Sequence, residues 1–140
     1  MQEYARLVGI DVGKKRVGIA QTDLLKTIAS PVGTYSPDEV FSVISTIVKE
    51  NNVERFIVGW PLTPNGDEGP ATQMVEKFIN KLSGVYPEIP IEKVDERYTS
   101  KKAVESMVQA GVPKKKRREK ERVDRIAAAL ILQNYLDQIH

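Results

Sequence analysis

Four carboxylate side chains stand at three places far apart in the sequence, each beside an apolar segment. Asp11 follows a short apolar run, Asp95 and Glu96 end another, and Asp124 precedes the apolar stretch 126–132. If the fold brought these groups together, like charges would repel one another unless cations lay between them. Sites built only from oxygen ligands select hard divalent ions, and this chain has no cysteine. The pattern therefore favours a site for Mg²⁺ or Mn²⁺.

Each carboxylate taken alone also has a simpler explanation. Asp11 could form a turn with its own backbone, Asp95 and Glu96 could pair with Arg97, and Asp124 could pair with a neighbouring cation. The presence of all four carboxylates together favours a catalytic site over these simpler explanations. Two metal ions roughly 4 Å apart can activate a water molecule and stabilise the leaving oxygen when a phosphodiester is hydrolysed. The only histidine is His140, so a serine triad or a histidine general base is not expected.

Alternating β-branched and helical patterns indicate which elements must position these residues. Residues 6–13 and 16–23 predict a β-hairpin, and 27–36 a third strand. Ser36, Pro37 and Glu39 mark the start of a helix as cap, first-turn proline and capping-box partner. The segments that follow alternate, with strands expected at 55–61 and 89–97 and helices at 72–82, 99–111 and 121–139.

This order predicts an α/β fold with a mixed five-stranded sheet, its first three strands antiparallel and the later ones parallel, flanked by helices. In such sheets reactive groups collect at the ends of strands. In the last helix, the predicted buried stripe is Val123, Ala127, Leu130 and Ile131. Asp124 falls at the margin of that stripe, so it is expected to point along the packed face.

Length and composition limit the classes of protein that remain. A chain of 140 residues suits one domain, here 1–140, and no apolar run approaches the ~20 residues of a membrane span. With no signal-peptide pattern, we expect a cytoplasmic protein without a membrane partner.

Residues 114–125 hold 8 basic and 3 acidic side chains, whereas the rest of the chain holds 13 basic and 16 acidic ones. This local positive charge is either a solvated face or a contact for a polyanion.

Four segments resemble the motifs of the YqgF or RuvX family, whose members are described as Holliday junction resolvases and as nucleases of precursor 16S ribosomal RNA. The segments are GIDVGKKRVGIAQTD (9–23), VGWPLTPNGDEGPAT (58–72), VDERYTS (94–100) and VDRIAAALIL (123–132). The resemblance covers nearly the whole chain. It implies a ribonuclease H-like fold, in agreement with the order of elements predicted above.

The resemblance also implies roles for the acidic residues. Asp11 corresponds to the metal ligand on the first strand, Glu96 to the second acidic position and Asp124 to the third, and these three are the expected catalytic residues. Strand alternation alone does not decide between Asp95 and Glu96 as metal ligand. We favour Glu96 and keep Asp95 as a candidate.

Basic residues near these positions are expected to contact the phosphate backbone. Gly13 would let the chain turn closely beside Asp11. The expected nucleic-acid contacts are Lys14, Lys15, Arg16, Arg97, Lys115, Lys116, Arg117 and Arg118. Aromatic residues make up only 6% of the chain, so the shape of the nucleic acid should matter more than its sequence.

The function expected from this resemblance is metal-dependent cleavage at the 5′ end of precursor 16S rRNA during ribosome biogenesis. A Holliday junction resolvase is the alternative nuclease, and it would require a homodimer because a junction needs two active sites. A catalytically silent ribosome-assembly factor that binds nucleic acid is another class. A phosphotransferase of the actin and sugar-kinase type also begins with a strand and an aspartate-glycine turn, but it needs two such domains to enclose ATP.

Overall fold

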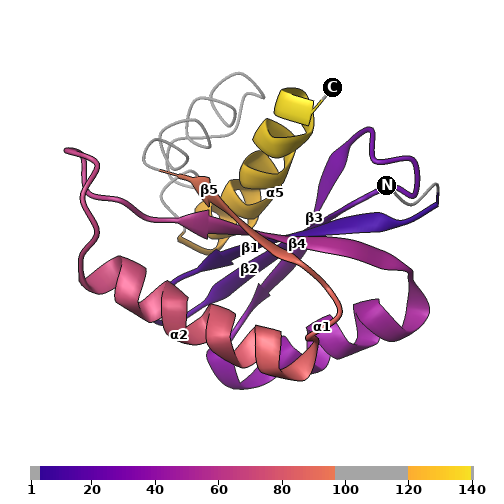
Figure 1. Ribbon diagram of the computed structural model, residues 1–140, viewed down its shortest axis with the longest axis horizontal. Helices are drawn as coiled ribbons and strands as arrows, with labels where there is room; N and C mark the ends of the chain where they lie inside the picture. Colours follow the sequence, from indigo (N-terminus) through magenta and orange to yellow (C-terminus); the bar gives the residue numbers. More distant parts are fainter. Residues whose placement is uncertain (1–3, 97–119, 140) are drawn as a thin grey trace.

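The five strands of this protein form one mixed sheet with helices on both faces (Figure 1). The computed structural model describes residues 4–96 and 120–139. The strands are β1 (Arg6–Val12), β2 (Val17–Thr22), β3 (Ala29–Tyr35), β4 (Val53–Trp60) and β5 (Ile91–Asp95). The helices are α1 (Pro37–Glu50), α2 (Pro70–Val85) and α5 (Lys120–Ile139). The helix expected at 99–111 lies outside the described residues.

The strand order in the sheet is β3-β2-β1-β4-β5. β1 pairs antiparallel with β2, and β2 with β3, whereas β1 with β4 and β4 with β5 are parallel. The predicted mixed topology is therefore confirmed. Because β1, β4 and β5 are parallel, their carboxyl ends lie at the same edge of the sheet. Residues that follow these strands are brought together there.

The sheet separates two apolar cores. Alternate residues of β1 serve different faces: Val8, Ile10 and Val12 pack with α1 and α2, whereas Leu7 packs with α5. Figure 1 shows α5 on one face of the sheet and α1 and α2 on the other. Asp11 has the same parity as Leu7, so it belongs to the α5 face.

The start of α1 differs in one detail from the predicted capping box. The Ser36 hydroxyl accepts a hydrogen bond from the Glu39 backbone N–H at 3.2 Å, as expected for an N-cap. The Glu39 carboxylate, however, accepts from the Ser36 hydroxyl at 2.9 Å. The hydroxyl can do both because it is donor and acceptor at once. The helix begins where it was predicted to begin.

The buried stripe of α5 differs from the predicted one. Leu130 is only partly buried, whereas Ala128 and Leu132 are fully buried. The reason is the close approach of α5 to β1 at Gly9, where an added Cβ would lie 2.9 Å from Leu132 Cβ and 3.1 Å from the Ala128 carbonyl oxygen. This contact fixes the rotation of the helix. The side chain of Val123 lies outside the description.

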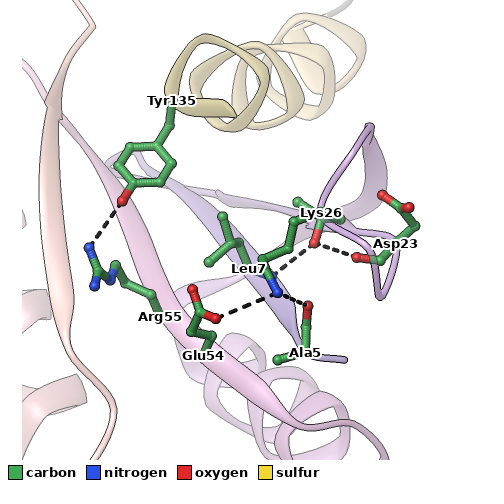
Figure 2. A network of polar contacts seen from close by, with 8 residues as sticks. Ala5, Leu7, Asp23, Lys26, Glu54, Arg55 and Tyr135 are labelled. Carbon is green, nitrogen blue, oxygen red and sulfur yellow. Dashed lines mark hydrogen bonds and ion pairs between the residues drawn. The ribbon is translucent and has the colours of Figure 1, made fainter. Parts of the chain in front are cut away.

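Polar contacts tie the amino-terminal ends of β1 and β4 to the loop between β2 and β3 (Figure 2). The buried Lys26 ammonium lies 3.5 Å from a Glu54 carboxylate oxygen and donates to the Ala5 carbonyl at 3.3 Å. Backbone N–H groups of Ile28 and Thr27 donate to the Asp23 carboxylate and lower its pKa to about 2. This network anchors the sheet at the edge opposite the carboxyl ends of β1 and β4.

Candidate active site

Asp11 and Glu96 come together at the carboxyl ends of β1 and β5. Asp11 is half-buried on the α5 face of β1, and Glu96 directly follows β5. The Glu96 backbone N–H donates to the Trp60 carbonyl at 3.3 Å, which holds this residue beside the end of β4. The carboxyl groups of Asp11 and Glu96 share a hydrogen bond. Two of the acidic residues expected to form a site are therefore neighbours.

Gly59 makes room for the Glu96 side chain. A Cβ added at Gly59 would lie 2.5 Å from Glu96 Oε2 and 2.7 Å from Ile131 Cδ1. The Glu96 side chain therefore crosses over β4, between this strand and α5, and extends toward Asp11. Gly59 was not among the residues predicted to shape the site. Its signal was a glycine inside an otherwise apolar strand, which often marks a close approach.

Burial and like charge act together on Glu96. Removal from water raises the pKa of the Glu96 carboxyl, and the negative charge of Asp11, the hydrogen bond to Asp11 and the charge of Asp95 raise it further, to about 9. At neutral pH the pair of Asp11 and Glu96 therefore retains one proton when no cation is bound. A divalent cation held by both carboxylates would take over the role of that proton. The chemistry of this pair fits a hard metal ion.

Asp95 lies on the other side of the strand. Alternation along β5 places it with Ile91, which packs on the core under α1 and α2, and with Lys93. The Lys93 ammonium contacts Glu76 of α2 at 3.1 Å and lies 3.9 Å from the centre of the Trp60 ring. Asp95 is exposed and acts on Glu96 through its charge. The structure thus groups Glu96, and not Asp95, with Asp11.

Asp124 lies on α5 at the same end of the sheet. The direction of the helix follows from its contacts, because Tyr135 hydrogen-bonds Arg55 near the start of β4 at 3.0 Å and Ile131 reaches Gly59 farther along that strand. α5 therefore runs antiparallel to β4, and Asp124 stands one turn before Ala128, toward the carboxyl ends of the strands. Its side chain is outside the description. Within the part of the chain that the structure describes, no group of three Asp, Glu, His or Cys side chains is placed to hold a metal ion.

The predicted phosphate contacts are described only in part. Lys14 and Lys15 are exposed and Arg16 is half-buried in the turn between β1 and β2, which closes through a 2.9 Å bond from the Gly13 N–H to the Arg16 carbonyl. This turn starts two residues after Asp11. The other predicted contacts lie outside the described residues, namely Arg97, Lys115, Lys116, Arg117 and Arg118.

Comparison with solved structures identifies the class of fold. RuvC of T. thermophilus, solved in complex with a Holliday junction substrate, superposes with a TM-score of 0.57 at 16% sequence identity, over 96% of each chain. The fold is therefore the ribonuclease H-like fold that the family resemblance implied, and the predicted order of strands and helices agrees with it.

The chain belongs to the RuvX family. The family model described as "RuvX: Holliday junction resolvase" matches residues 5–138. A relative from Chlorobium phaeobacteroides, named "Putative pre-16S rRNA nuclease", is 43% identical over 94% of this chain and 92% of its own length. A relative of the same name from Salinibacter ruber is 44% identical over 99% of this chain and 96% of its own length. The resemblance noted in the four sequence motifs is confirmed.

Proposed function

We propose that this protein is a metal-dependent endonuclease that hydrolyses phosphodiester bonds of structured nucleic acid, and that it processes the 5′ end of precursor 16S rRNA. The observation that carries the proposal is the half-buried, hydrogen-bonded carboxyl pair of Asp11 and Glu96 at the carboxyl ends of two strands. The relatives named as nucleases of precursor 16S rRNA support the choice of substrate. Such a role belongs to ribosome biogenesis in the cytoplasm.

The residues divide into two groups by task. Asp11 and Glu96 would hold Mg²⁺ or Mn²⁺, with Asp124 as the third ligand, while Asp95 adds negative charge nearby. When bound, such ions activate water and stabilise the leaving oxygen. Lys14, the first of three cations in the β1–β2 turn, would contact phosphates beside the bond to be cut. The Asp11–Glu96 pair keeps its geometry because Gly59 leaves space for Glu96.

Holliday junction resolution is the second candidate function, because the matching family model carries that description. A four-way junction offers two equivalent strands for cleavage, so this function would require two active sites and hence a homodimer.

Within the described residues, no helix is both long enough and apolar enough to span a membrane.

The two substrates are best compared side by side with the same purified protein. We expect cleavage of a precursor 16S rRNA fragment in Mg²⁺ or Mn²⁺ and complete loss of cleavage with a chelator. Gel analysis of labelled RNA and of a labelled four-way DNA junction measures both reactions. Preferential cutting of the junction would favour the second candidate. If neither substrate is cut but both are bound, the protein is a binding factor and the proposed activity is wrong.

A further inference from the structure

A groove lies on the face of the sheet opposite α5, between α1, α2 and the turn that joins β1 to β2. Its volume is about 370 Å³. The floor is apolar and is formed in part by Phe41 of α1 and by Met74 and Phe78 of α2. The rings of Phe41 and Phe78 are 5.1 Å apart between centroids, so they form one continuous apolar surface. The groove is separate from the carboxylate pair, which lies on the α5 face.

Three lysines line this groove: Lys14 from the β1–β2 turn, and Lys77 and Lys81 from successive turns of α2. All three are exposed, and among the described residues no carboxylate lies within ion-pair distance of their ammonium groups. The Lys81 ammonium lies 4.5 Å from the centre of the Phe41 ring, which holds it over the groove. Of the lining residues that the structure describes, Asp38 is the only acidic one. The groove therefore carries a net positive charge above an apolar floor.

The groove opens at the same edge of the sheet as the candidate active site. Val12 and Gly13 line it, and they directly follow Asp11. Because successive residues of β1 face opposite sides, Asp11 stands on the α5 side and Val12 on the groove side. The β1–β2 turn, with its exposed Lys14, is the short path between them. A strand that leaves the active site can pass around this turn into the groove.

We propose that this groove binds the single-stranded part of the nucleic-acid substrate that flanks the bond to be cut. Positive charge that follows a groove, together with apolar and aromatic surface, is the combination that binds single strands without reading their sequence. The lysines would contact phosphates, and the apolar floor would accept a base or sugar. This inference rests on the proposed nuclease function and adds to it a second contact region outside the carboxylate site.

The test compares two RNA hairpins, one blunt and one with a short single-stranded extension, binding to the full chain in a chelator. We expect wild type to bind the extended hairpin more tightly. In the double variant Lys77→Gln/Lys81→Gln this preference should disappear, and the slope of log affinity against log salt for the extended hairpin should fall by about 0.7 for each lost phosphate contact. Lys49→Gln, which removes an exposed charge near the end of α1 outside the groove, is the matched control and should keep the preference.

Thermal unfolding checks that all variants are folded. The single variant Lys77→Gln removes one groove charge but keeps the contact of Lys81 with Phe41, so it separates the effect of charge from the effect of that contact. A double variant that keeps the wild-type preference and salt slope would overturn the groove proposal, whether or not wild type cleaves RNA. Cleavage in Mn²⁺ is measured separately. Absence of cleavage together with lysine-dependent binding of the extension would overturn the proposed nuclease function and leave the groove supported.

Discussion

Asp11→Asn is expected to abolish metal-dependent cleavage and to leave the fold intact. The substitution keeps the size of the side chain and removes a charged oxygen ligand. Loss of a residue that only supports a metal ligand lowers activity by up to about 100-fold, so loss of a ligand itself should lower the cleavage rate by more than that. Cleavage of labelled precursor rRNA in saturating Mn²⁺ measures the loss. A variant that cuts at the wild-type rate would show that Asp11 is not a ligand.

The stability of Asp11→Asn provides the control for this prediction. In the absence of metal, the negative charge of Asp11 disfavours ionisation of the half-buried Glu96 carboxyl and so raises its pKa, while the hydrogen bond between the two groups needs only an acceptor oxygen, which Asn also offers. Removing this charge should leave the thermal midpoint unchanged or raise it slightly. A large decrease in the midpoint would instead assign Asp11 a structural role as a turn former.

Glu96→Gln and Asp95→Asn are expected to have different effects, although the two residues are adjacent. Glu96 shares a hydrogen bond with Asp11 on the α5 face, whereas Asp95 is exposed on the other side of β5. Glu96→Gln should therefore eliminate cleavage, and Asp95→Asn should lower it only modestly. Titration of Mn²⁺ against both variants tests the assignment. Near-wild-type activity of Glu96→Gln at saturating Mn²⁺, with loss in Asp95→Asn, would reverse it.

The raised pKa of Glu96 also makes metal-free stability depend on pH. In the unfolded chain Glu96 ionises near its ordinary value of 4.5, whereas in the folded protein its pKa is about 9. Between these values the folded state binds more protons than the unfolded state, so the contribution of Glu96 to stability decreases as pH rises. Urea unfolding of wild type should show this decrease between pH 5 and pH 9, beyond that of Glu96→Gln. Parallel curves would contradict the burial of this carboxyl.

Much of the fold follows from the sequence because its local signals agree with one another. The strand and helix patterns, and the cap at Ser36, predicted the mixed sheet that the structure shows. The rotation of α5 could not be predicted, because residues 126–132 are apolar on every side and only the contact of Leu132 and Ala128 with Gly9 selects a face. For a helix that is apolar on all sides, tertiary packing determines which face is buried.

The candidate site was predictable in its residue types but not in its geometry. Strand alternation separates Asp95 from Glu96 but does not say which of them faces the partner carboxylate. That answer depends on the space above Gly59 and on the side of the sheet that α5 covers. The proton held by the carboxyl pair also depends on burial, which no local pattern reveals. In the sequence, the lysines of α2 look like part of a solvated helix face. Only the structure shows that they share a groove with Lys14 and the two phenylalanine rings.

The most direct test of the central claim is the number of protons released when Mn²⁺ binds. Titration calorimetry at pH 7 in buffers of different ionisation enthalpy measures that number without requiring cleavage. Because Asp11 and Glu96 together retain one proton at this pH, binding of the cation should release about one proton in wild type and markedly less in Glu96→Gln. Binding of Mn²⁺ to wild type without proton release, or equal release by wild type and Glu96→Gln, would contradict the account.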